Sequence, residues 1–279
     1  MTISSNPNPN PNTLTLALFK GDYLRQEMPK SGCCGPAELI KLEIFRFTEY
    51  DRIIILDADT LLFQPIDELF EDEQHDAIWT VDRNLGGNCV NGGWLVLSPA
   101  KAVYEKLVDI VREGDFREGS AWGGKNVGWC YGGQTFQGVI PYYFQYVHKD
   151  AKGPEDEKKY WREADSCIYN NMGDNTNEKG RDQATILFVG ARSNPSPNHN
   201  PNHNHNQATV PVKEVKTAHF TVCQKPWDFC WIGQGKPLCQ EFHEEWWKVR
   251  NQLEKENGLH QSDRCDNGQY KPLDIYTKT

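Results

Sequence analysis

The sequence predicts an α/β protein in which a mostly parallel sheet is flanked by helices in a single domain. The aliphatic run Ile53–Leu56 is typical of a strand buried on both faces of a parallel sheet. Strand-like and helix-like segments alternate along the chain, and its 279 residues are enough to bury a substantial core. Ligands of such sheets bind beyond the carboxyl ends of the strands, so residues that follow strands are the first site candidates.

The elements near the Ile53–Leu56 strand follow from local patterns. Ala37–Tyr50 has the spacing of apolar and polar residues expected of a helix. Gly93–Leu97 reads as a second strand. Ala100–Arg112 reads as a helix, with Ser98 as N-cap and Pro99 in its first turn. A helix is therefore predicted before the Ile53–Leu56 strand, and a strand and a second helix are predicted after it.

Composition divides the chain into three predicted parts. Residues 1–12 form a disordered tail of alternating Asn and Pro. Residues 13–245 form the folded domain, which includes the strand-like Ala184–Val189 and a low-complexity insertion at 193–207. Residues 246–279 carry the end of a helix predicted over Phe242–Lys255, and then a tail. The insertion is rich in His, and such tracts can bind metal, but its composition favours a solvated surface loop.

Charge and cysteine content narrow the function classes. The net charge of −9 disfavours nucleic acid, which needs a basic surface, but it permits a nucleotide ligand whose charge a divalent cation offsets. No stretch is apolar enough for a membrane helix, and the first residues do not form a signal peptide. Nine cysteines without a Cys-x-x-Cys spacing argue against structural zinc and leave disulfides open.

The acidic pair Asp57 and Asp59 directly follows the Ile53–Leu56 strand. Residues two apart in an extended chain project to the same side, and two close carboxylates repel unless a cation such as Mg²⁺ or Mn²⁺ lies between them. The alternative is a polar turn in which Asp59 caps a following helix. Haloacid dehalogenase phosphatases also place Asp-x-Asp after a strand. They have Thr or Val two positions beyond the second Asp, where this chain has Leu61, so we rank that class third.

Two further candidates lie far downstream, in the segment His219–Trp227. The imidazole of His219 can complete a carboxylate-rich Mn²⁺ site. The ammonium of Lys225 can neutralise a departing diphosphate. The alternative for each is ordinary: a hydrogen-bonded core histidine and a solvated lysine.

Taken together, these motifs resemble the glycogenin-like members of glycosyltransferase family 8. The resemblance runs from about Gly35 to Trp227 and rests on several motifs in the same order. The motifs are Glu38–Leu42 with Tyr50–Thr60, Pro65–Phe70, Asn91–Pro99, Ile168–Asn170 and His219–Trp227.

The resemblance implies a GT-A fold and a retaining transfer of a hexose from a UDP-sugar to a carbohydrate or protein acceptor. It implies that Asp57, Asp59 and His219 hold Mn²⁺ or Mg²⁺, with Asp57 also near the ribose. A cation and a lysine placed where phosphate leaves the sugar stabilise the transition state more than the ground state.

The resemblance also implies the residues that contact the donor. Lys41 and Lys225 are expected on its phosphate side, while Asn91 and Gln137 are expected to face the sugar. The sugar, the acceptor and the oligomeric state are not fixed by the sequence. Relatives of this kind occur in the cytosol and as Golgi enzymes with an N-terminal anchor, so both compartments stay open.

Three departures from the family pattern support a second hypothesis, a non-catalytic or truncated glycosyltransferase-like binding protein. Phe136 stands where the family has Asp before Gln137, and Val222 stands where it has Gly. The family's opening strand and helix, which seat uracil and ribose, need more chain before Lys41 than is present. Thr13–Phe19 alternates like a strand but lies too close to Lys41, so we expect part of the N-terminal nucleotide-binding unit to be lacking.

Overall fold

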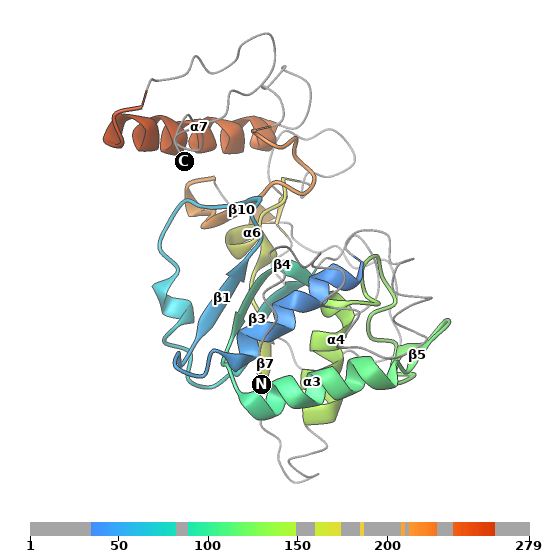
Figure 1. The fold of residues 1–279 in the computed structure, drawn as a ribbon. Helices are drawn as coiled ribbons and strands as arrows, with labels where there is room; N and C mark the ends of the chain where they lie inside the picture. The colour runs from blue at the N-terminus through green and yellow to red at the C-terminus, as the bar shows by residue number, and fades with distance from the viewer. Residues whose placement is uncertain are drawn as a thin grey trace, which may run out of the picture. The chain divides into compact units, whose positions relative to one another are not determined.

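The computed structural model describes most of the chain from residue 35 to residue 259 (Figure 1). The predicted tail at 1–12, the strand-like Thr13–Phe19 and the insertion at 193–207 lie outside the described residues. Contacts divide the chain into two compact units, Met1–Leu56 with Asp67–Ala164, and Asp57–Ile66 with Asp165–Thr279. The described residues are 35–81, 89–148, 160–173, 212–227 and 237–259, with the backbone of 185–186 and 208–209.

The first unit is built on a four-stranded sheet in the order β1-β4-β3-β7. Strand β4 is buried along its whole length and pairs antiparallel with β1 and with β3, whereas β3 and β7 pair in parallel. The strands are β1 (Ile53–Leu56), β3 (Ala77–Val81), β4 (Val90–Leu97) and β7 (Trp161–Glu163).

The predicted α/β class is confirmed, but the expectation of a mostly parallel sheet is wrong for the described strands. Two of the three pairings are antiparallel, and β1 is only partly buried. The aliphatic run at β1 identifies a strand but carries no information on direction, because direction depends on which distant strand pairs with it.

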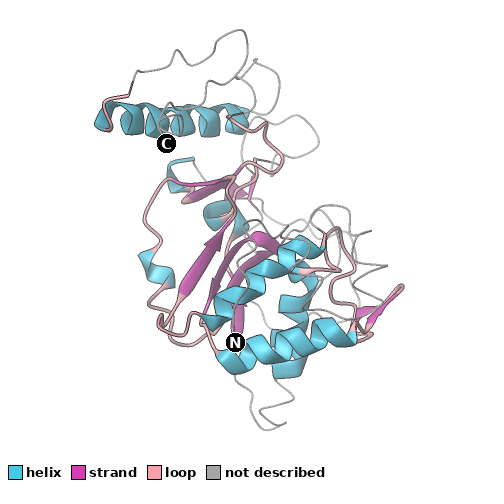
Figure 2. Ribbon diagram, viewed as in Figure 1, coloured by secondary structure: helices cyan, strands magenta, loops and turns pink. Residues whose placement is uncertain are grey.

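Helices of the first unit pack against a buried cluster to which the sheet contributes Trp79, Leu95 and Leu97 (Figure 2). In the 3₁₀ helix η2, Leu39, Leu42 and Phe45 are all buried, and their spacing of three residues matches the three residues per turn of this helix. The remaining elements are η2 (Pro36–Arg46), η3 (Asp67–Leu69), α3 (Lys101–Glu113), β5 (Phe116–Arg117), β6 (Ala121–Trp122), α4 (Phe136–Tyr142) and the π-helical turn η5 (Tyr143–Val147).

The helix predicted over Ala100–Arg112 is confirmed as α3, but its N-cap is not Ser98. Ala100 occupies the cap position, and the main-chain N–H of Ser98 instead donates to the carbonyl of Asp76 at 2.8 Å. The helix ends at Gly114, whose φ of 62° places it in the left-handed region that favours glycine at helix ends.

The second unit contains the strand pair β2–β10 and the longest helix. Its core includes Phe220, Leu238 and Phe242, and the disulfide Cys223–Cys239 joins the segment after β10 to α7. The strand expected within Ala184–Val189 is present at β8, and the helix expected over Phe242–Lys255 lies inside α7. The elements are β2 (Thr60–Leu62), α6 (Ser166–Tyr169), β8 (Thr185–Ile186), β9 (Ala208–Thr209), η6 (Val212–Glu214), β10 (Thr217–His219) and α7 (Pro237–Glu256).

Within the described ranges, no helix combines the length and apolar character needed to cross a membrane.

Candidate metal centre

The acidic pair lies in a tight turn between β1 and β2. The carbonyl of Asp57 accepts hydrogen bonds from the N–H of Thr60 at 3.0 Å and from its hydroxyl at 2.8 Å. Since Thr60 opens strand β2 rather than a helix, the alternative in which Asp59 caps a helix is wrong. The turn brings the two carboxylates onto one short stretch of backbone.

Strand pairing brings His219 to this turn. In the antiparallel register of β2 and β10, His219 lies opposite Thr60. The main-chain N–H of Phe220 donates to the carbonyl of Asp59 at 2.8 Å and extends the pairing by one step. Because the β2–β10 ladder is only three residues long, this extra bond helps to hold the end of β10 against the acidic turn.

Asp57, Asp59 and His219 form the candidate metal centre. Each offers one ligand atom, and the three atoms lie within 4.8 Å of one another. The Nε2 atom of His219 is 3.2 Å from Oδ1 of Asp59, and the imidazole is almost fully buried, at 5% exposure. Two carboxylate oxygens and one imidazole nitrogen suit Mn²⁺ or Mg²⁺, with the remaining positions left to ligand oxygens. The residues therefore fit the cation expected from the sequence.

A buried amide orients the imidazole of His219. The Nδ1 atom of His219 is 3.0 Å from Oδ1 of Asn170, whose side chain is buried. With the amide oxygen assigned as the acceptor, Nδ1–H donates to Asn170, so in the tautomer that binds a cation the lone pair of Nε2 would face the acidic turn. Asn170 lies in the family motif Ile168–Asn170, which is the sequence signal that points to it.

The segment that carries Asn170 is paired with β10. The N–H of Asn171 donates to the carbonyl of Thr217, and the N–H of His219 donates to the carbonyl of Asn171, both at 2.9 Å. The side-chain amide of Asn171 closes the turn, donating to the carbonyl of Cys167 and accepting from the N–H of Gly173. Asn170 and His219 therefore lie on backbones that are locked to each other.

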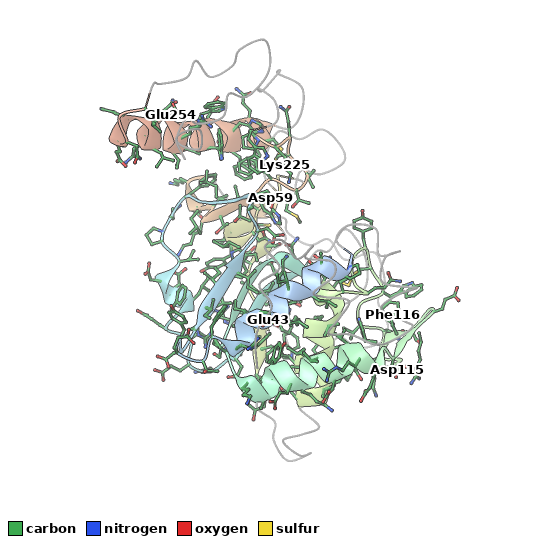
Figure 3. The ribbon with its side chains drawn as sticks, viewed as in Figure 1. Glu43, Asp59, Asp115, Phe116, Lys225 and Glu254 are labelled. Carbon is green, nitrogen blue, oxygen red and sulfur yellow. A yellow bond between two sulfur atoms is a disulfide. The ribbon has the colours of Figure 1, made fainter. Side chains whose placement is uncertain are left out.

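Lys225 completes the charged group around Asp59 (Figure 3). Its ammonium donates to Oδ2 of Asp59 and to the carbonyl of Phe220, and its side chain remains 30% exposed. Burial by itself would raise the pKa of Asp59, but hydrogen bonds from His219 and Lys225 outweigh burial and hold that pKa well below its usual range. Asp59 is therefore ionised at neutral pH.

Two contacts with α7 hold the Lys225 segment. Cys223, two residues before Lys225, forms a disulfide with Cys239 of α7. Nε2 of His243, also in α7, lies 2.6 Å from the carbonyl of Gln224. Burial lowers the pKa of His243, so the neutral imidazole donates its Nε2–H to this carbonyl. The sequence left disulfides open, and the structure also joins Cys89 to Cys130 in the first unit.

The other predicted site residues, Lys41, Asn91 and Gln137, lie in the first unit around Gly92. The ammonium of Lys41 donates to the carbonyl of Gly92 at 2.9 Å, and Oε1 of Gln137 accepts from the N–H of Gly92 at 2.8 Å. Oδ1 of Asn91 accepts from the N–H of Gly93 at 3.0 Å. The structure thus brings these three residues together, and each of them binds main chain of β4.

Glu38, a polar residue of the predicted helix, also belongs to this group. Its side chain is only 4% exposed, accepts a hydrogen bond from the hydroxyl of Thr135, and lies 3.4 Å from the ammonium of Lys41. A Cβ atom on Gly92 would come within 2.6 Å of the Glu38 carboxylate. We call Glu38, Lys41, Asn91 and Gln137 the Gly92 cluster.

Two of the three departures from the family pattern, Phe136 and Val222, differ in their surroundings. Phe136 is fully buried in the main core of the first unit, so its ring is unavailable to a ligand. Val222 is about half exposed, at 49%. The Phe136 position therefore serves packing in this chain.

Comparisons with known proteins confirm the similarity to glycogenin-like proteins over a short part of the chain. No protein-family model matches the chain. It is 33% identical to glycogenin-1 of Oryctolagus cuniculus over 79 residues, which cover 27% of the chain and 22% of that protein. It is 26% identical over 119 residues to UDP-glucuronate:xylan alpha-glucuronosyltransferase 1 of Arabidopsis thaliana, covering 43% of the chain and 16% of that protein.

These matches span about a fifth of the length of the curated relatives. Among solved structures, an active-site mutant of LgtC aligns with 85% of the chain and 72% of its own, at 13% identity and a TM-score of 0.42. That is a distant likeness. The resemblance to glycogenin therefore rests on the matched sequence and on the motifs.

Proposed function

We propose that this protein is a metal-dependent glycosyltransferase of GT-A type that moves a hexosyl group from a UDP-sugar to a carbohydrate or protein acceptor, with retention of configuration. The observation that carries the proposal is the convergence of Asp57, Asp59 and His219, whose ligand atoms lie within 4.8 Å of one another. Its second support is the sequence similarity to glycogenin-1 and to a plant glucuronosyltransferase.

In this proposal the candidate metal centre holds Mn²⁺ or Mg²⁺, which when bound neutralises the diphosphate oxygens of the donor. Asn170 keeps the Nε2 lone pair of His219 directed at the centre. The partly exposed ammonium of Lys225 supplies a second positive charge for the departing diphosphate.

Three members of the Gly92 cluster are proposed to have the donor-side roles that the resemblance implies. Lys41 is proposed to lie on the phosphate side, and Asn91 and Gln137 on the sugar side. The contacts of these residues with β4 support a positioning role, since they fix the backbone at Gly92 and Gly93.

Calorimetric titration of UDP, with and without Mn²⁺, tests the proposal. In wild type, Mn²⁺ should strengthen UDP binding, and Asp59→Ala should weaken Mn²⁺-dependent UDP binding by about 100-fold or more, since even partners behind a metal ligand are worth about 10- to 100-fold. The exposed Glu241→Ala, a charge-matched control in the same unit, should behave as wild type. Equal UDP affinities for wild type and Asp59→Ala would contradict the assignment.

A second candidate function, donor binding without turnover, is favoured by one observation. Phe136 is buried in the core and stands where the family resemblance would place an Asp beside the sugar or the acceptor, so this chain lacks that carboxylate. Hydrolysis assays with UDP-glucose, UDP-galactose, UDP-glucuronate and UDP-xylose separate the two functions. A binding protein should bind UDP with Mn²⁺ yet release no sugar from any of these donors.

A further inference from the structure

The carboxylate of Asp59 is shared between two groups that the proposed function gives separate tasks. Its Oδ2 accepts from the ammonium of Lys225, and its Oδ1 lies 3.2 Å from Nε2 of His219. The candidate metal centre also uses a carboxylate oxygen of Asp59 and a ring nitrogen of His219 as ligand atoms. Lys225 therefore already pairs with a carboxylate that a divalent cation needs.

A divalent cation and an ammonium on one carboxylate repel each other, and each weakens the hold of the other on that carboxylate. We infer that Lys225 is a competing internal cation for Asp59, and that a nucleoside diphosphate relieves the competition by drawing the ammonium onto its own oxygens. Binding of the divalent cation and of the diphosphate is then coupled through Lys225, in addition to any direct contact between them. This inference rests on the proposed function, because it takes Asp59 as a metal ligand.

The geometry allows the ammonium to exchange partners. Lysine has three N–H donors on a flexible stem, and two of them go to Asp59 and to the carbonyl of Phe220. The side chain of Lys225 is 30% exposed, whereas the imidazole of His219 is 5% exposed, so an incoming anion reaches the ammonium more easily than the imidazole. Lys225 can keep its bond to Phe220 while a phosphate oxygen replaces Asp59.

The backbone around Lys225 is held while the side chain exchanges. The disulfide Cys223–Cys239 and the bond from His243 to the carbonyl of Gln224 anchor the residues before it to α7. The carbonyl of Asp59 is bonded to the N–H of Phe220. Competition therefore requires only rotation of the Lys225 side chain, so removal of its charge should act on binding rather than on the fold.

Calorimetric titration of the full chain with Mn²⁺, alone and at saturating UDP, tests the inference. Lys225→Met keeps the length of the side chain and removes its charge, and Lys225→Gln keeps a hydrogen-bond donor without the charge. Both variants should bind Mn²⁺ alone about tenfold more tightly than wild type, within the range of about 5- to 150-fold typical of coupled sites. The gain in Mn²⁺ affinity that UDP brings should be smaller in both variants than in wild type.

Lys213 is an exposed lysine of the same unit. Lys213→Met removes the same charge as Lys225→Met and should leave Mn²⁺ affinity unchanged. If Asp59→Asn loses Mn²⁺ binding but Lys225→Met and Lys225→Gln bind Mn²⁺ no more tightly than wild type, the inference is wrong and the proposed metal centre stands. If neither wild type nor any Lys225 variant binds Mn²⁺, the metal centre fails, and the inference fails with it.

Discussion

The candidate metal centre and the Gly92 cluster are both built from residues that the sequence singles out, but their polar groups end on different partners. In the Gly92 cluster, Lys41, Asn91 and Gln137 bind main-chain groups of β4. Around the metal centre, Asp59 binds the side chains of His219 and Lys225. Hydrogen bonds to the main chain of a buried strand hold these side chains in place, whereas the ammonium bound to Asp59 can turn to another group.

This difference separates positioning from binding. A polar group that binds a buried strand stabilises the fold and sets the shape of its surroundings. A carboxylate that binds an ammonium and an imidazole remains able to accept a cation, because the ammonium can turn to another group and the imidazole can itself bind the cation. Variants in the two regions should therefore affect different quantities, and three of them test the comparison.

The largest expected effect is on the link that holds the Lys225 segment to α7. Cys239→Ser breaks the disulfide with Cys223, which closes a sequence separation of 16 residues, and should lower the free energy of unfolding by about 3 kcal/mol. Denaturant titration measures the change. Cys167→Ser alters a buried thiol that is in neither disulfide and serves as the control. An unchanged unfolding midpoint for Cys239→Ser would show that the disulfide does not support this unit.

The next effect should fall on the Gly92 cluster. Glu38→Ala removes the buried acceptor shared by Thr135 and Lys41 and should lower the free energy of unfolding by about 1–3 kcal/mol. Its Mn²⁺ affinity should equal that of wild type, because Glu38 is not a ligand of the metal centre. The exposed Glu105→Ala gives the cost of a surface carboxylate in the same unit. A large loss of Mn²⁺ affinity in Glu38→Ala, with stability intact, would reverse the comparison.

The smallest effect should come from the residue behind His219. Asn170→Ala leaves all three ligands in place but removes the acceptor for Nδ1–H, and it should weaken Mn²⁺ binding about tenfold. Asn170→Asp, which keeps an acceptor oxygen, should retain most of the affinity. Mn²⁺ titration followed by electron paramagnetic resonance distinguishes the two variants. Equal losses in both would mean that the amide does not act through the imidazole.

Local patterns predicted much of the fold. The aliphatic run at β1, the strand at β4 and the helices α3 and α7 follow from composition and spacing, and the structure confirms them. The burial of Glu38 could not be predicted, since a Glu in an amphipathic helix is ordinarily on the surface. Its burial depends on Thr135, almost a hundred residues away in the sequence.

The site shows the same division between local and distant information. Asp57 and Asp59 are identified by their place after a strand, and His219 and Lys225 by the order of motifs in the resemblance. Neither the disulfide Cys223–Cys239 nor the contact between Asn170 and His219 follows from any local pattern. The disulfide joins the segment after β10 to α7, and the Asn170–His219 contact joins the end of α6 to β10, so both depend on how distant elements meet.

By itself, the sequence determined which residue types stand at the end of β1 and in the segment after β10, and therefore the chemistry open to them. Only the tertiary structure decided that Lys225 meets Asp59, 166 positions away, and that His219 lies opposite Thr60. The physical reason is that spacing along a chain fixes which side chains share a face of one element. Which elements become neighbours is decided by strand register and core packing, and these depend on the whole chain at once.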